Sequence, residues 1–394
     1  MREIRKLYLF TFFRSLTFFS AVSIAFYCDN DLTYFQIMFL QTIYGLATAL
    51  MELPSGVLSD LVGRKTTLII GTVSFLFAYL LGSIGTSMTP FCIMQILAAA
   101  GQSCYSGTFA SLMYEDVKAS EDVEKSVNVI FANMQSINII AVLLASLTSS
   151  IIVRYANMRC TYYFTVIAYM VTLIIAILLS DAGQPNILNS NRVSVYKDEV
   201  VKSIKIIKYN GIAAIMIDMV IVASFVNTFS YMQQPILISN GLDVEYLGIV
   251  TFIITVGTVL MLKIMPKIEK KITETGITLF TLIGILVVMS NAIVKNYIWN
   301  SVSFLAITII IRYRDIILTN KINSYIENDA RATTMSIISA VQMIVLAIMS
   351  IIIGKIEDIS IYNAVLLLSC VTIILYIIII VFLKKHRIKE SQHI

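Results

Sequence analysis

Ionisable side chains lie within long apolar stretches of this sequence, where they would face hydrocarbon, and four of them are candidates for chemistry. They are Arg14, Asp218, Arg312 and Asp315. Because a charge inside a bilayer is costly, such residues mark proton relays, ion sites or substrate sites unless they reach the membrane surface. Asp218 has a short side chain that cannot reach far, so it is the best candidate for a carboxylate that binds a proton or a cation.

A proton cycle at Asp218 would need burial to favour the neutral acid and an approaching arginine to favour the carboxylate. Arg14 lies at the corresponding place in the first half of the chain, each residue being roughly 10 Å above the inner end of its span at about 1.5 Å per residue. Their opposite signs permit an ion pair, and the alternative is that each reaches the cytoplasmic interface separately. Arg312 and Asp315 share a helix face, so they are either functional or an ion pair that holds their helix in place, with Arg314 pointing elsewhere.

The elements that must position these residues are membrane spans. Of 394 residues, 58% are hydrophobic and 13% are charged, against about 25% charged in soluble domains. Together with a mean hydropathy of +0.85, this indicates a polytopic membrane protein and excludes a soluble enzyme with a single anchor. The net charge of +5 comes from basic residues at the ends of apolar runs, so no nucleic-acid partner is expected.

Twelve apolar stretches are long enough to cross a bilayer as helices, which need about 20 residues. They lie near 7–27, 33–54, 67–86, 90–114, 126–152, 160–180, 211–234, 246–266, 275–294, 298–320, 332–354 and 361–383. Most of the Lys and Arg residues fall on the side that a cytoplasmic N-terminus would occupy, which predicts that both termini are cytoplasmic. The predicted class is an all-α integral membrane protein.

The polar stretch in the middle of the chain divides the spans six and six. We therefore expect an N-terminal six-helix bundle at 1–180, a cytoplasmic linker at 181–210, a C-terminal six-helix bundle at 211–383 and a basic tail at 384–394. Residues 196–208 are either an amphipathic helix on the inner leaflet or a solvated connector.

The loop between the second and third spans carries a recognisable motif, which reads GVLSDLVGRK from Gly56 to Lys65. It resembles motif A of the major facilitator superfamily, G-x-L-a-D-r-x-G-r-k, at the loop position where that family carries it. The resemblance implies the family's fold of two six-helix bundles and a conformational latch on the cytoplasmic side. The implied latch residues are Gly56, Asp60, Gly63, Arg64, Lys65, Glu115, Asp116 and Arg331.

In that latch, Asp60 would face the start of the eleventh span near Arg331, and Arg64 would pair with Glu115 or Asp116. Glu52, just before Pro54, is assigned to the latch rather than to the substrate site. The fifth span contains neither glycine nor proline, whereas the antiporter signature of the family's drug exporters is glycine-rich with a proline. The resemblance therefore favours a carrier more strongly than it favours proton antiport.

Polar but uncharged side chains in the outer half of the predicted bundles form a second set of candidates. Such a lining suits amphipathic or weakly polar substrates better than sugars or strongly anionic solutes. The candidates are Gln95, Gln102 and Tyr105 in the fourth span, Gln135 and Asn138 in the fifth, and Asn227, Tyr231, Gln233 and Gln234 in the seventh.

These features favour a secondary active carrier that works by alternating access and exports small hydrophobic or amphipathic compounds on the proton gradient. The alternative within transport is a proton-coupled importer or facilitator of a nutrient or peptide-like solute. A membrane-embedded enzyme and a channel are disfavoured, because both histidines lie in the basic tail and no filter sequence repeats.

The expected partners are a small-molecule substrate, a coupling proton and the lipid bilayer of the inner or plasma membrane. The five cysteines show no metal-binding or disulfide spacing, so no metal and no cofactor is expected. We expect the chain to act as a monomer.

Overall fold

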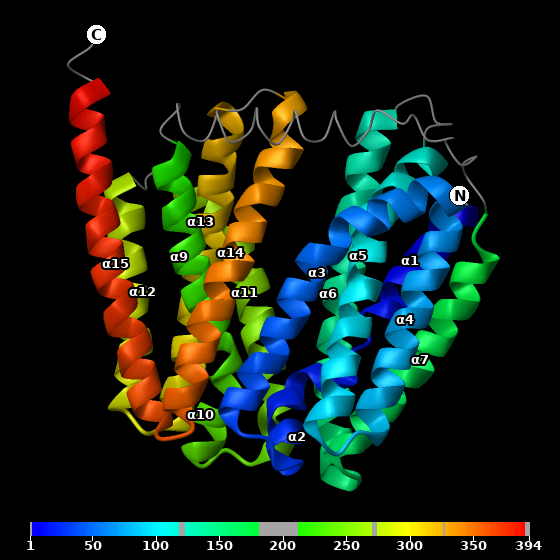
Figure 1. Cartoon of the computed structure of the whole chain (residues 1–394), viewed down its shortest axis with the longest axis horizontal. Helices are drawn as coiled ribbons and strands as arrows, with labels where there is room; N and C mark the ends of the chain where they lie inside the picture. The colour runs from blue at the N-terminus through cyan, green and yellow to red at the C-terminus, as the bar shows by residue number, and fades with distance from the viewer. Residues whose placement is uncertain (1, 118–122, 181–211, 270–273, 326–327, 391–394) are drawn as a thin grey trace. The chain divides into compact units, whose positions relative to one another are not determined.

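The computed structural model describes residues 2–117, 123–180, 212–269, 274–325 and 328–390. Throughout these ranges the regular structure is helical and no strand occurs (Figure 1). The predicted all-α class is confirmed. Its physical basis is that hydrocarbon offers backbone N–H and C=O groups no partner, so each helix must satisfy its own.

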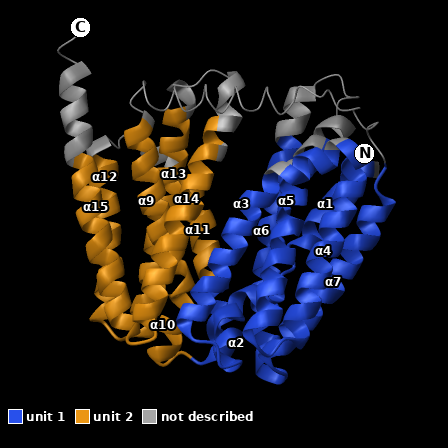
Figure 2. Ribbon diagram, in the orientation of Figure 1, with its two compact units in different colours: residues 1–188, 243–252 blue, residues 189–242, 253–394 orange. Residues whose placement is uncertain are grey.

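Two compact units divide the chain, and unit 1 comprises residues 1–188 and 243–252 (Figure 2). Its elements are α1 (Arg2–Arg14), η1 (Phe18–Val22), α2 (Ser23–Asp29), α3 (Tyr34–Val62), α4 (Arg64–Ile84), α5 (Met88–Val117), α6 (Val123–Tyr155), α7 (Met158–Leu178), η2 (Val244–Tyr246) and the start of α11 (Leu247–Glu269).

Unit 2 comprises residues 189–242 and 253–394. Its elements are α9 (Ile212–Tyr231), α10 (Gln233–Ser239), the remainder of α11, α12 (Glu274–Met289), η3 (Ser290–Ala292), α13 (Tyr297–Tyr325), α14 (Asn328–Glu357) and α15 (Ile361–Glu390). The predicted linker at 181–210, with its helix at 196–208, lies outside the described residues, as does the end of the tail from 391 onward.

Nine helical segments of the described residues are long and apolar enough to cross a membrane. The predicted spans near 90–114, 275–294 and 298–320 fall on α5, α12 and α13, which are not among those nine. The multi-pass membrane character is thus established, whereas the total of twelve spans and the cytoplasmic termini stay predictions.

The first predicted span, 7–27, is not one continuous helix. The α1 helix ends at Arg14, and α2 begins at Ser23 after the short η1. Hydroxyl groups satisfy the backbone at the break, since Ser15 Oγ donates to the Thr11 carbonyl at 2.7 Å and the Phe18 amide donates to Thr165 Oγ1 on α7 at 3.1 Å. Serine and threonine side chains compete with helical hydrogen bonds in this way, and the apolar pattern conceals the interruption.

The seventh predicted span, 211–234, is also interrupted, because α9 ends at Tyr231 and α10 begins at Gln233. Pro235 explains the break. A proline has no N–H to donate to the carbonyl four residues earlier, which here belongs to Tyr231, and its ring crowds that carbonyl. Gln233 and Gln234 therefore lie in the first turn of α10 rather than at the end of a longer helix.

The two broken spans end in matching turns, at Asn30-Asp31-Leu32 and Asn240-Gly241-Leu242. The Leu32 amide donates to the Tyr27 carbonyl at 3.1 Å, and the Leu242 amide donates to the Leu237 carbonyl at 3.0 Å. The middle residue of each turn has a positive φ, 59° at Asp31 and 92° at Gly241. The two units thus contain the same type of turn after the broken span, as expected for internal repeats.

In unit 1, α4 packs against both α5 and α7, and α5 also packs against α3. The α4 and α5 helices approach closely at Gly71 and Gly101, because a Cβ at Gly71 would lie 2.7 Å from Cys104 Cβ and one at Gly101 would lie 2.8 Å from the Gly71 carbonyl oxygen. Small residues commonly permit such approaches between membrane helices.

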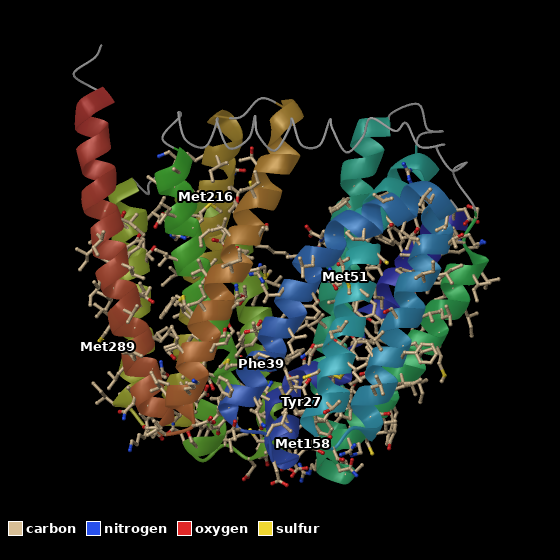
Figure 3. All side chains as sticks on the ribbon, in the orientation of Figure 1. Tyr27, Phe39, Met51, Met158, Met216 and Met289 are labelled. Carbon is tan, nitrogen blue, oxygen red and sulfur yellow. The ribbon has the colours of Figure 1, made fainter. Side chains whose placement is uncertain are left out.

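A buried aromatic cluster joins α2 to its neighbours in unit 1. Tyr27 is 1% exposed, and Met158 at the start of α7 packs against the same cluster (Figure 3). The ring centroids of Tyr27 and Phe91 are 5.0 Å apart, and those of Phe26 and Tyr162 are 4.8 Å apart.

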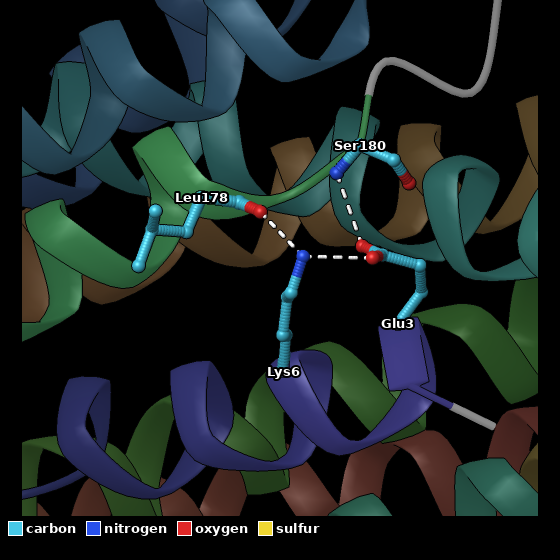
Figure 4. Close-up of polar contacts among 4 residues, drawn as sticks. All are labelled: Glu3, Lys6, Leu178 and Ser180. Atoms are coloured by element: carbon cyan, nitrogen blue, oxygen red, sulfur yellow. Dashed lines mark hydrogen bonds and ion pairs between the residues drawn. The ribbon is translucent and has the colours of Figure 1, made fainter.

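At the other end of unit 1, polar contacts join the start of α1 to the end of α7 (Figure 4). Lys6 Nζ donates to the Leu178 carbonyl at 2.6 Å and pairs with Glu3 at 2.7 Å. Glu3 Oε2 in turn accepts the Ser180 amide at 3.0 Å. These bonds satisfy backbone groups at the C-terminal end of α7, where cationic side chains are favourable.

Arg159, near the start of α7, joins three segments of unit 1. Its Nη1 donates to the carbonyls of Ser83 and Gly85 at 2.9 Å each, and its Nη2 donates to Asn30 Oδ1 at 2.8 Å. The guanidinium therefore caps the end of α4 and holds the turn after α2.

We predict that Arg159→Lys lowers the thermal stability of the purified chain although it keeps the charge. A lysine cannot donate from two nitrogens in the planar fork geometry, so at least one buried acceptor loses its partner at a cost of about 1–3 kcal/mol. Arg154→Lys, at an exposed site on α6, is the matched control. Equal melting temperatures for the two variants would contradict this role of Arg159.

Candidate functional site

Asp218 on α9 and Arg314 on α13 form a buried ion pair inside unit 2, with Arg314 Nη2 2.5 Å from Asp218 Oδ2. The α9 helix, which carries Asp218, packs against α13, α14 and α15. The Arg314 side chain is 1% exposed and the Asp218 side chain 12%. Two charges so far from water are stable only while each neutralises the other.

The pair leaves several polar atoms without a hydrogen-bond partner among the described residues, including Asp218 Oδ1 and Arg314 Nε and Nη1. The Arg314 guanidinium thus forms its ion pair with one carboxylate, that of Asp218. Removal of that negative charge, by mutation or by a proton, would leave a buried cation without its counter-ion.

Arg314 is the functional candidate that the sequence analysis missed. The counter-ion of Asp218 comes from within its own unit, and the partner expected from the first half, Arg14, has other contacts. The depth of each residue within its span was the sequence signal that could have identified Arg314 as the partner of Asp218. Asp218 is about seven residues from the inner end of the seventh predicted span and Arg314 about six from that of the tenth, so at about 1.5 Å per residue they lie at nearly the same level.

Arg312 and Asp315 do not form the ion pair with each other that the sequence analysis offered as one reading. Both residues are described, and the ion pair found on this part of α13 is the one between Arg314 and Asp218. The Asp315 carboxylate interacts electrostatically with Arg314, Arg312 and Asp218. Two arginines and two aspartates therefore make a charge-balanced cluster on α9 and α13.

A cavity of about 310 Å³ adjoins this cluster, between α9, α13 and α14. That volume equals roughly ten water molecules at about 30 Å³ each, enough for a small solute. Arg312 and Asp315 both line it, together with Asn227. The other lining residues are Met219, Ala223, Val226, Ser230, Thr308, Ile311, Thr319 and Gln342.

Arg14 in unit 1 lies among neutral partners instead of carboxylates. Its Nη2 donates to Gln102 Oε1 at 2.8 Å, and its guanidinium carbon lies 3.4 Å from the centroid of the Tyr105 ring and 5.6 Å from that of Phe75. An amide oxygen and aromatic faces stabilise a cation without neutralising it. Three residues predicted for two different roles, Arg14, Gln102 and Tyr105, thus form one cluster.

A second cavity of about 200 Å³ lies within unit 1 and is richer in aromatic rings. Gln95, a predicted cavity residue, is one of its few amides and is 7% exposed. The remaining lining residues are Phe19, Ser20, Ser23, Tyr27, Gln41, Tyr44, Phe75, Tyr79, Met94 and Ala98.

The other predicted cavity residues are dispersed. Asn138 on α6 accepts a hydrogen bond from Ser15 Oγ at 2.7 Å, so it supports the break after α1. Gln135 is exposed on the same helix. Tyr231 ends α9, and Gln233 and Gln234 begin α10; neither described cavity is lined by these three.

The predicted latch is described only in part. Gly56 and Asp60 lie on α3, Gly63 is the turn with φ 86° that separates α3 from α4, and Arg64 and Lys65 begin α4. Glu115 and Asp116 lie on α5 and Arg331 on α14, but these three side chains and that of Asp60 are outside what the structure describes. Glu52 is exposed on α3. The latch contacts stay predictions.

Long apolar helices, interrupted spans and charged residues beside small polar cavities define a multi-pass membrane carrier. The sequence matches the family model of the Major Facilitator Superfamily over residues 7–348. The chain therefore belongs to this superfamily and is a transporter rather than an enzyme.

Solved structures with this fold include the nucleoside transporter NupG, with a TM-score of 0.80 at 11% identity over 97% of this chain and 99% of that chain. A POT family transporter in complex with 5-aminolevulinic acid matches with a TM-score of 0.73 at 14% identity, over 98% of this chain and 96% of that chain. The peptide transporter POT in complex with sulfate matches with a TM-score of 0.76 at 12% identity, over 98% of this chain and 94% of that chain. No curated protein matches the sequence significantly.

We predict that Asp218→Asn destabilises the chain by about 3–5 kcal/mol, because it leaves the Arg314 cation buried and unpaired. The double variant Asp218→Asn with Arg314→Gln removes both charges and should recover part of that loss. Unfolding of the purified chain in a denaturant series would measure both, with Lys263→Gln, at an exposed position on α11, as the control. A double variant that is less stable than Asp218→Asn would contradict the pairing.

Proposed function

We propose that this chain is a proton-coupled secondary carrier in which Asp218 accepts the coupling proton and Arg314 responds to it. The buried ion pair is the observation that carries the proposal. An ionised Asp218 holds Arg314 at 2.5 Å, whereas a protonated Asp218 no longer neutralises it. Arg314 then has one other carboxylate within electrostatic reach, that of Asp315.

Protonation at this position is linked to helix packing because the two partners lie on different helices. Asp218 belongs to α9 and Arg314 to α13, and α9 also packs on α14 and α15. A change of partner by Arg314 would alter the contact between α9 and α13 beside the cavity. This supplies a physical route by which a proton could bias the carrier between conformations of alternating access.

The solute that the unit 2 cavity favours is polar. Its lining carries one cation, one anion, two amides and three hydroxyl groups, and a purely apolar solute would desolvate these groups without replacing their hydrogen bonds. The structures of similar fold include a nucleoside transporter and a peptide transporter, which supports a polar solute. We therefore favour a nutrient or peptide-like solute, carried by import or facilitated exchange.

Export of small hydrophobic or amphipathic compounds is the second candidate, and the cavity of unit 1 favours it. That cavity is lined by five aromatic rings and by no charged side chain, and its polar groups are two amides and the hydroxyls of serine and tyrosine. Aromatic walls with an occasional amide suit amphipathic molecules.

A proteoliposome assay under an imposed pH gradient separates these candidates. The nutrient function predicts gradient-driven accumulation of amino acids, peptides or nucleosides, and the export function predicts movement of a lipophilic fluorescent dye. In either case we expect Asp218→Asn to abolish accumulation and to retain downhill exchange, which also shows that the variant is folded. Unchanged accumulation in Asp218→Asn would exclude Asp218 from the coupling step.

The motif A residues are proposed to stabilise one conformation of the carrier. We expect Asp60→Asn to slow transport several-fold and to leave substrate binding intact, because the latch would act on conformational equilibrium and not on the solute. Asp243→Asn, at an exposed carboxylate outside the motif, is the control. If Asp60→Asn eliminated binding in a folded protein, Asp60 would belong to the substrate site.

A further inference from the structure

The cavity of unit 2 presents two opposite charges that form no ion pair with each other. Arg312 and Asp315 lie three residues apart on α13, and both line the same space. The ion pair of this region joins Arg314 to Asp218 instead. Asp315 Oδ1 is buried and has no hydrogen-bond partner among the described residues, so this oxygen is an acceptor that lacks a donor.

We propose that this cavity binds a small zwitterion, an amino acid or a short peptide, whose carboxylate lies on Arg312 and whose ammonium lies on Asp315. The proposal rests on the proposed carrier function and assigns it a class of substrate. Guanidinium groups match carboxylates in a two-point geometry, and an ammonium group supplies the donors that the Asp315 carboxylate lacks.

Charge balance selects a zwitterion over solutes with a single charge. An anion that binds Arg312 would have the Asp315 carboxylate close by, and a cation that binds Asp315 would have Arg312 close by. Side chains three residues apart on a helix have Cβ atoms about 5–6 Å from one another. Either solute would therefore meet a like charge within a few ångströms, whereas a zwitterion places opposite charges at both positions.

The rest of the lining suits the remaining parts of such a solute. Asn227 and Gln342 offer amide donors and acceptors for a peptide bond or a polar side chain. Met219, Ala223 and Val226 on α9 and Ile311 on α13 provide apolar surface in the same cavity. The neighbouring pair of Asp218 and Arg314 is already neutral, so it adds little net charge to the site.

The test uses thermal stabilisation and calorimetric binding with the detergent-purified full chain. The probes are the proteinogenic L-amino acids and a set of alanyl dipeptides. The best ligand is then compared with its N-acetylated and its C-amidated form. We expect at least one zwitterion to bind, and each blocked form to bind about 10- to 100-fold more weakly, as expected for loss of a charge-assisted hydrogen bond.

Two variants assign the ends of the ligand. Arg312→Gln should weaken the zwitterion about 10- to 100-fold and should not weaken the C-amidated form, because that form has no carboxylate to lose and no longer meets a like charge at this position. Asp315→Asn should weaken the zwitterion and, for the same reason, should not weaken the N-acetylated form. Lys321→Gln, on the same helix outside the cavity, should bind every form as the parent does.

Binding that is equal for zwitterion and blocked forms, or that is insensitive to both variants, would overturn the assignment. Failure of every zwitterion to bind would overturn it as well. If the same preparation still moved a dye or a nucleoside on a pH gradient, the carrier function would stand and only the zwitterion site would fall.

Discussion

The ion pair of Asp218 and Arg314 is the interaction on which the interior of unit 2 depends. A cation that is 1% exposed in a helix bundle is costly without a counter-ion, and here the Asp218 carboxylate supplies it. This requirement fixes α9 against α13 at the level of the pair. Arg312 and Asp315 are not part of this ion pair, and both line the adjacent cavity.

Unit 1 meets the same constraint with different chemistry. Arg14 is held by an amide oxygen and by the face of Tyr105, so its positive charge is stabilised but not neutralised. The two units share a plan, with a broken first helix and a turn after it that has a leucine bonded back to the helix. Their interiors nevertheless differ, with aromatic rings in the cavity of unit 1 and charged side chains in that of unit 2.

Several conclusions could be reached from the sequence because they depend on local pattern. Apolar stretches of about 20 residues predict membrane helices, and the run from Gly56 to Lys65 identifies the superfamily through residues close together in the chain. Asp218, Arg312 and Asp315 were identifiable as candidates because a charge in an apolar stretch is conspicuous. The breaks at Ser15 and Met232 were less visible, since one depends on the hydroxyl groups of Ser15 and of Thr165 on α7 and the other on the effect of Pro235 on a carbonyl four residues earlier.

The sequence by itself determined the class of protein, the helices and the set of intramembrane charges, because hydropathy and charge are properties of each residue and its neighbours. Only the tertiary structure decided which charges pair. Arg14 was the partner expected for Asp218 by sign and depth. The partner is Arg314 instead, and this outcome depends on which faces of α9 and α13 meet. It likewise decided that Arg312 and Asp315, neighbours on one helix, line a cavity rather than bind each other. Helix packing sets both outcomes through contacts between residues far apart in the chain.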